Sequence, residues 1–182
     1  LNREARALSR AGADVIQIDE PCFNIYTDEV ADWGLEILER AFDGVTAKRA
    51  VHICYGYGTE VVLRWKNDNT DWDHYKSTLP LLADSSIDQV SVECAASGVK
   101  PDVLNCLSDK EVMVGVIDVG TEKVEPATVV ADRIREALQH VDAERLIACT
   151  DCGMVPRSRQ AAAGKINALT AGTALVNQEL SG

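Results

Sequence analysis

The sequence predicts an α/β fold built from repeated β/α units, of the (β/α)8 TIM-type barrel class, to which this chain supplies roughly the last five units. Three observations support this class. Strand-like runs alternate with helical segments five times, as in βαβ units. The runs are almost continuously apolar, as expected for parallel strands covered on both faces. A doubly wound open sheet can also use five units, but no Gly-x-Gly-x-x-Gly fingerprint follows a strand.

The first two units are delimited by residues that start or stop an element. In order, we expect a helix over 2–11, a strand over 14–19, a helix over 27–41 and a strand over 49–54. Gly12 ends the first helix and Pro21 stops the first strand. Thr27 is a suitable N-cap for the second helix, with Asp28 and Glu29 favourable in its first turn.

The later units repeat the alternation after a polar connection over 59–75. In order, we expect a helix over 73–83, a strand over 89–93, a short helix over 101–108, a strand over 112–119, a helix over 126–140, a strand over 146–150 and a long helix from about Ser158. Pro126 suits a first-turn position of its helix.

Composition narrows the class of partner and the compartment. The chain has 182 residues and a net charge of −11, which argues against nucleic acid as a partner because phosphate binding needs a basic surface. No apolar stretch is long enough to span a bilayer, so no membrane partner is expected. Six cysteines without a secretion signal indicate a reducing, cytoplasmic location. The start at Leu1 resembles the middle of a helix, so we expect residues 1–182 to be the C-terminal part of one catalytic barrel domain whose N-terminal part is absent.

Four residues near the ends of expected strands have the side chains of a zinc site. They are His52, Cys54, Glu93 and Cys152. Thiolate, imidazole and carboxylate groups all ligate Zn²⁺. In a parallel β/α fold the strand ends converge on one face, so residues distant in sequence can meet there. The sequence therefore predicts a catalytic zinc centre.

Each of these residues also has a simpler interpretation. His52 and Cys54 can be core packing, Glu93 can form a buried ion pair with a lysine or arginine, and Cys152 can be a small residue in a tight turn. Cys149 and Cys152 also form a Cys-x-x-Cys pair, but Cys149 lies inside its expected strand rather than at a helix start, which disfavours a redox motif.

Carboxylates at other strand ends are candidates for substrate contact and catalysis. Asp19 and Glu20 follow the first expected strand, where they can bind a substrate ammonium group. The alternative is that Asp19 caps the next loop and Glu20 faces solvent. Asp118 ends the fourth strand in the corresponding position and is the candidate catalytic residue.

Five segments together resemble a known family. They are IQIDEP at 16–21, HICY at 52–55, VSVE at 90–93, GVIDV at 115–119 and DCG at 151–153. Their order and content resemble the C-terminal catalytic domain of cobalamin-independent methionine synthase, over essentially the whole chain.

The resemblance implies an activity and assigns roles to single residues. It implies a barrel of the uroporphyrinogen decarboxylase and methionine synthase type, with zinc held by His52, Cys54, Glu93 and Cys152. It implies that Asp19 holds the amino group of homocysteine, and that the homocysteine thiol is methylated to methionine. The implied partners are homocysteine and a methyl donor, either a folate or a corrinoid carrier.

Two positions depart from the family pattern. Ile25 stands where the family has an acidic residue near the folate, and Gly120 stands where it has a general-acid histidine. Both changes concern the methyl donor rather than the thiol, so we expect a donor other than methyltetrahydrofolate, such as a corrinoid protein.

Two rival functions stay open from sequence. A related zinc methyltransferase can act on another thiol, such as coenzyme M, without needing Asp19. Alternatively, four protein ligands can hold a purely structural zinc in a non-enzymatic domain.

Overall fold

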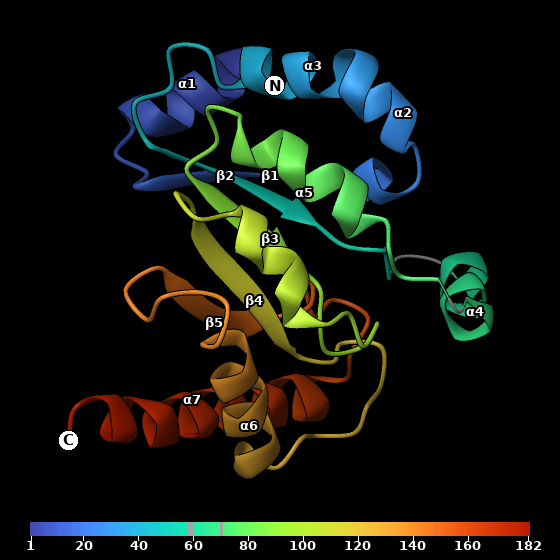
Figure 1. Cartoon of the computed structure of the whole chain (residues 1–182), viewed down its shortest axis with the longest axis vertical. Helices are drawn as coiled ribbons and strands as arrows, with labels where there is room; N and C mark the ends of the chain where they lie inside the picture. The colour runs from blue at the N-terminus through green and yellow to red at the C-terminus, as the bar shows by residue number, and fades with distance from the viewer. Residues whose placement is uncertain (58–59, 70) are drawn as a thin grey trace.

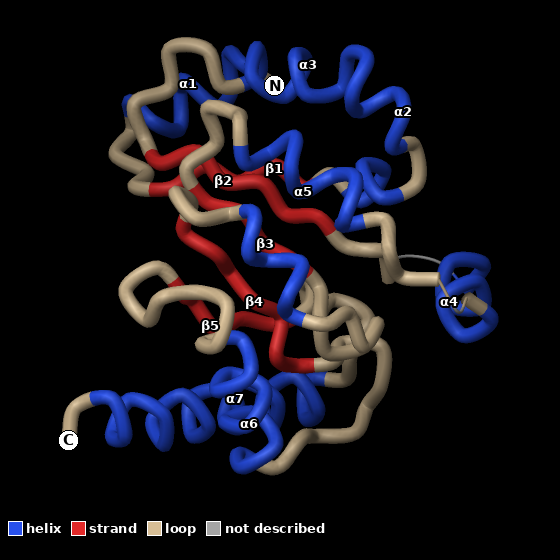
Figure 2. Tube along the Cα trace, viewed as in Figure 1, coloured by secondary structure: helices blue, strands red, loops and turns tan. Residues whose placement is uncertain are grey.

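The computed structural model describes residues 1–57, 60–69 and 71–182. Its centre is one sheet of five parallel strands in the order β1-β2-β3-β4-β5 (Figures 1 and 2). The strands are β1 Val15–Asp19, β2 Lys48–Ile53, β3 Gln89–Val92, β4 Glu111–Ile117 and β5 Leu146–Thr150. Sequential neighbours joined by helical crossovers form the order of a β/α barrel, whereas a doubly wound sheet reverses its order part-way. The predicted class is confirmed as a five-unit portion of such a barrel.

Helices connect successive strands and cover the sheet. They are α1 Asn2–Arg10, α2 Thr27–Glu29, α3 Leu35–Ala41, α4 Glu60–Asp68, α5 Tyr75–Ala83, α6 Ala127–Ala137 and α7 Arg159–Leu180, with short helices η1 Pro21–Asn24, η2 Val30–Gly34 and η3 Pro101–Cys106. Figure 1 shows α1 to α3 beside the β1 edge, α6 and α7 at the β5 edge, and α4 apart from the others. No helix in the described ranges is long and apolar enough to cross a membrane.

Most predicted elements occur within two residues of their expected bounds. The polar connection predicted over 59–75 was wrong in one respect, because it contains α4; residues 59 and 70 lie outside the described part. The second helix begins at Thr27, so Tyr26 rather than Thr27 occupies the N-cap position. Ser158 is the N-cap of α7, where its Oγ accepts a hydrogen bond from the Ala161 amide.

The core lies between the strands and the helices that cover them. In β2, Ala50, Val51 and Ile53 are fully buried. Val90 and Val92 of β3 are equally buried. Two-sided burial fixes the register of these strands, because a slip by one residue would exchange the side chains of the two faces. The register in turn fixes which side chains meet at the carboxyl ends.

Candidate metal centre

Three of the four predicted ligands meet at the carboxyl end of the sheet. His52 lies in β2, Cys54 directly follows β2, and Cys152 lies two residues after the end of β5. Their ligand atoms all lie within 4.8 Å of one another. The two Sγ atoms are 3.8 Å apart, and both cysteines are free thiols.

The closeness of these thiols shows how strongly the sheet curves. Strands β3 and β4 lie between β2 and β5. With about 4.8 Å between neighbouring strands, a flat sheet would separate β2 from β5 by about 14 Å. The Cys54 and Cys152 sulfurs nevertheless come within 3.8 Å. The curvature of a barrel brings the two strand ends together on its inner side.

The donor atoms fit a zinc ion. Bonds of about 2.3 Å from a tetrahedral Zn²⁺ to two sulfurs place those sulfurs about 3.8 Å apart, as the thiols are here. His52 Nδ1 is 2.8 Å from Ser91 Oγ, while its Nε2 is buried and has no hydrogen-bond partner among the described residues. A histidine that ligates metal through one ring nitrogen usually has the other oriented by a hydrogen bond. The orphaned Nε2 is therefore suited to a metal ion.

The two thiols do not ionise alike. A hydrogen bond from the Cys54 thiol lowers the pKa of Cys152, and His52 lowers it further. The same contact with Cys152, together with burial, raises the pKa of Cys54. The metal-free pair therefore favours one thiolate and one thiol. Because a metal ion needs both as thiolates, its binding would release a proton.

Glu93, the fourth predicted ligand, lies outside this group of three. Its fully buried carboxylate pairs through Oε1 with Lys66 Nζ at 2.5 Å. Its Oε2 accepts a hydrogen bond from the Tyr55 amide at 3.0 Å. The buried ion pair that the sequence left open is thus present in the structure. Zinc ligation by Glu93 stays a prediction.

Asp19 shares a cavity with two of the predicted metal ligands. This cavity of about 210 Å³ is lined by Gln17, Asp19, His52, Ser91, Met113, Cys149, Thr150, Cys152 and Gly153. Asp19 is the register partner of His52 on the adjacent strand. Gln17 Nε2 donates a hydrogen bond to Asp19 Oδ1 at 2.8 Å. The carboxylate is therefore held in the same cavity as His52 and Cys152.

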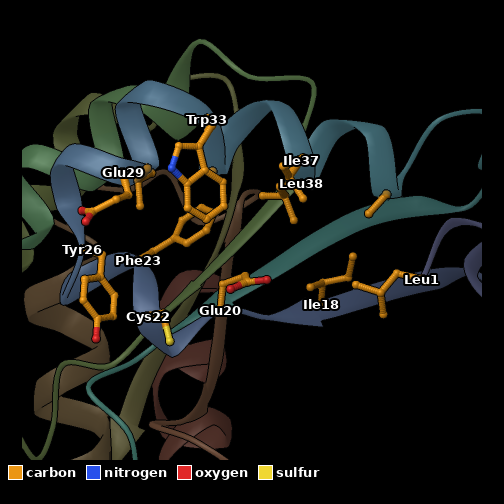
Figure 3. A pocket seen from close by; sticks show the side chains of 13 residues that line it. Leu1, Ile18, Glu20, Cys22, Phe23, Tyr26, Glu29, Trp33, Ile37 and Leu38 are labelled. Atoms are coloured by element: carbon orange, nitrogen blue, oxygen red, sulfur yellow. The ribbon is translucent and has the colours of Figure 1, made fainter.

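Glu20 lies in a different cavity. Its side chain lines an apolar cavity of about 440 Å³ between β1 and the segment that contains α2 and α3, near Phe23 and Trp33 (Figure 3). Burial, followed by the charge of Asp19, raises the pKa of Glu20. Neighbouring residues of an extended chain point to opposite faces, so Asp19 and Glu20 diverge. This placement lends no support to the predicted role of Glu20 in substrate binding.

Asp118 lies in a third cavity, also of about 210 Å³, together with Tyr57, Lys66 and Gly120. Asp118 Oδ1 accepts a hydrogen bond from the Gly120 amide at 2.6 Å. The Asp118 amide donates to Glu125. Asp118 therefore does not line the cavity that holds Asp19, His52 and Cys152, and its catalytic role stays a prediction.

Asp151 is a buried residue of the site that sequence reasoning treated only as a neighbour of Cys152. Its carboxylate accepts hydrogen bonds from the amides of Cys94, Ala95 and Ala96. Burial, followed by the charge of Glu93, raises the pKa of Asp151 to about 7. Asp151 thus ties the end of β5 to the segment after β3. A charged residue closing an apolar strand was the available signal.

The Cys-x-x-Cys spacing does not produce a thiol pair. The sulfur near Cys152 is that of Cys54, not of Cys149. Cys149 lies within β5, and burial raises its pKa to about 12. A redox function of this motif therefore has no geometric support.

Comparison with known proteins identifies the family. The model of "Cobalamin-independent synthase, Catalytic domain" matches residues 1–174. The chain belongs to this family. Methionine synthase of Saccharolobus islandicus is 34% identical over 182 residues, which are 99% of this chain and 49% of that protein. Methionine synthase of Sulfurisphaera tokodaii is 29% identical over 180 residues, 99% of this chain and 48% of that protein.

Solved structures agree with the family assignment. A B12-independent methionine synthase from Shewanella sp. W3-18-1, solved in complex with selenomethionine, is 49% identical, with a TM-score of 0.94 over 98% of this chain and 53% of that one. A methyltransferase from Methanosarcina mazei, 20% identical with a TM-score of 0.63, covers 94% of this chain and 44% of that one and shares the fold. The chain thus spans about half the length of the relatives it matches.

Proposed function

We propose that this chain carries the thiol-activating half of a zinc-dependent methyltransferase that converts homocysteine to methionine. The observation that carries the proposal is the cavity that holds Asp19 beside His52 and Cys152. Family membership supports it, and so does the relative from Shewanella, because selenomethionine is the selenium analogue of the product.

His52, Cys54 and Cys152 would hold the zinc, with Glu93 as the fourth ligand. A bound Zn²⁺ deprotonates a coordinating thiol, and the thiolate is the nucleophile in alkylation. Ser91 would orient the His52 ring through Nδ1 and leave Nε2 for the metal ion. Asp19, held by Gln17, would bind the substrate ammonium group and so fix the position of the substrate sulfur. Asp118, which lies in another cavity, stays the candidate catalytic carboxylate because of its position at the end of β4.

A methyl-transfer assay of the full-length protein tests the function. Homocysteine and coenzyme M are offered with methyltetrahydrofolate or a methylated corrinoid, and methylated thiol is measured by mass spectrometry. Formation of methionine supports the proposal. Methylation of coenzyme M alone would favour the rival thiol, and tight zinc binding without any methyl transfer would favour a structural zinc.

Asp19→Asn is expected to weaken homocysteine binding by about ten- to a hundredfold, because hydrogen bonds to charged groups contribute about 1.5–3 kcal/mol. Zinc content should not change, since Asp19 is not a ligand. The measurement is calorimetric titration of the zinc-loaded protein with homocysteine.

Glu20→Gln is the matched control for Asp19→Asn, because it makes the same charge change in the neighbouring cavity. We expect it to leave homocysteine affinity unchanged. Equal losses in both variants would contradict the separate placement of the two carboxylates, and no loss with Asp19→Asn would point to a substrate without an amino group.

Methyltetrahydrofolate is expected to be a poor donor compared with a methylated corrinoid. The methyl group of the folate becomes a good electrophile only after its nitrogen is protonated, and Gly120 offers no side chain to supply the proton. Initial rates with the two donors at equal concentration check this. A folate-dependent rate equal to or above the corrinoid-dependent rate would overturn it.

A further inference from the structure

Lys66 is a buried cation next to the predicted metal site. It lies in α4, and 8% of its side chain is exposed. Its Nζ is 2.5 Å from Glu93 Oε1 and 3.5 Å from the centroid of the Tyr57 ring. A lysine this buried is rare unless paired, and its carboxylate partner is Glu93.

Both oxygens of the Glu93 carboxylate already have a partner. Lys66 binds Oε1 and the Tyr55 amide binds Oε2. Tyr55 directly follows Cys54, so the carboxylate lies next to the thiol segment without joining the group of three ligands. To join the three ligands, the Glu93 carboxylate would have to leave its present position, in which Lys66 holds it.

The same ion pair links α4 to the site. α4 stands apart from the sheet in Figure 1. A second link between α4 and the site is Trp65, whose ring stacks at 6.1 Å on Tyr55 and contacts Trp72 edge-on at 6.0 Å. Release of Lys66 from Glu93 would therefore change the surroundings of Trp65.

We propose that Lys66 is a positioning residue that competes with the metal ion for the Glu93 carboxylate, so that metal ligation by Glu93 and the Lys66–Glu93 ion pair exclude each other. The inference rests on the proposed zinc centre. A buried carboxylate left without a partner is costly, and Lys66 compensates it when no metal is bound. The ion pair thereby weakens metal affinity and couples α4 to occupation of the site.

The test is zinc affinity, measured by competition with a chromophoric chelator. Lys66→Met should tighten zinc binding by about ten- to a hundredfold, the equivalent of one charged hydrogen bond, and Lys66→Gln should act in the same direction. Lys66→Arg keeps the cation and should stay near wild type. In a Glu93→Gln background, Lys66→Met should not change zinc affinity, because the carboxylate for which Lys66 and zinc compete is absent.

Lys165→Met is the matched control. Lys165 is also a buried lysine paired with a carboxylate, Glu125 at 3.0 Å, but it lies in α7. Its loss should lower stability and leave zinc affinity unchanged. A tightening in this variant equal to that of Lys66→Met would overturn the specific role of Lys66.

Trp65 provides a second readout that does not depend on activity. In a Trp33→Phe/Trp72→Phe background, zinc should shift the Trp65 emission to longer wavelength, and Lys66→Met should remove this response. Unchanged zinc affinity in Lys66→Met and Lys66→Gln, with binding still dependent on Cys54 and Cys152, would overturn this inference alone. Absence of zinc binding in the wild type would overturn the proposed metal centre as well.

Discussion

Cys54→Ser and Cys152→Ser are each expected to abolish tight zinc binding. A serine hydroxyl is a far weaker ligand than a thiolate, and the loss should exceed the roughly 10- to 100-fold change typical of residues that only orient a ligand. Both variants should fold, because serine is close to cysteine in size. The measurement is metal content after purification, followed by chelator competition.

Cys106→Ser is the control for both variants. Cys106 is a half-buried free thiol at the end of η3, and its Sγ donates to the Val103 carbonyl. The Cys106→Ser variant should retain full zinc content. Full zinc content in Cys54→Ser and Cys152→Ser as well would contradict the proposed metal centre.

Gly115→Ala is expected to cause the largest loss of stability. A Cβ at Gly115 would lie 2.1 Å from Asp151 Oδ1 and 2.8 Å from Asp151 Cα. Overpacking costs about 1–3 kcal/mol, and displacing Asp151 would strand the three amides that it binds, at about 1–3 kcal/mol for each buried group left unsatisfied. With every contribution at its low end the total is about 4 kcal/mol, so we expect a loss of about 4 kcal/mol or more in urea unfolding, at the upper end of point-mutant effects.

Substitutions at two other glycines distinguish an effect on packing from an effect on metal binding. Gly172→Ala would bring a Cβ to 2.6 Å from Val130 between α6 and α7, so it should lower stability without changing zinc affinity. Gly153→Ala meets nothing within 4 Å and should be neutral. Because Asp151 precedes Cys152, Gly115→Ala should weaken zinc binding as well. An unfolding midpoint equal to that of the wild type would contradict this account of Gly115.

The strands and the thiol–imidazole group could be predicted because their signals are local or topological. Apolar runs define β2 and β5, and parallel topology requires their carboxyl ends to share one face. The sequence could not predict that Asp19 and Glu20 point in different directions, because that depends on the residue at which β1 ends. The identity of the Glu93 partner could not be predicted, because Lys66 lies in α4, a nine-residue helix in the stretch that was interpreted as a polar connection.

Asp118 shows a related limit. A strand-end position places a side chain at the mouth of the sheet but not in a particular cavity, and here β4 directs Asp118 towards Tyr57 and Lys66 rather than towards the thiols. Which cavity a carboxylate enters depends on the twist of its strand and on the following loop. Neither is encoded in a pattern of a few residues.

The separation of Cys54 and Cys152 in the chain has a consequence for biosynthesis. The two thiols that touch in the structure are 98 residues apart in sequence. A ribosome that adds about 5–20 residues per second needs about 5–20 s to pass from one to the other. During that interval His52 and Cys54 have been synthesised while Cys152 has not. At that stage the nascent chain would carry only part of the proposed ligand set, so acquisition of the proposed metal ion would follow the synthesis of β5.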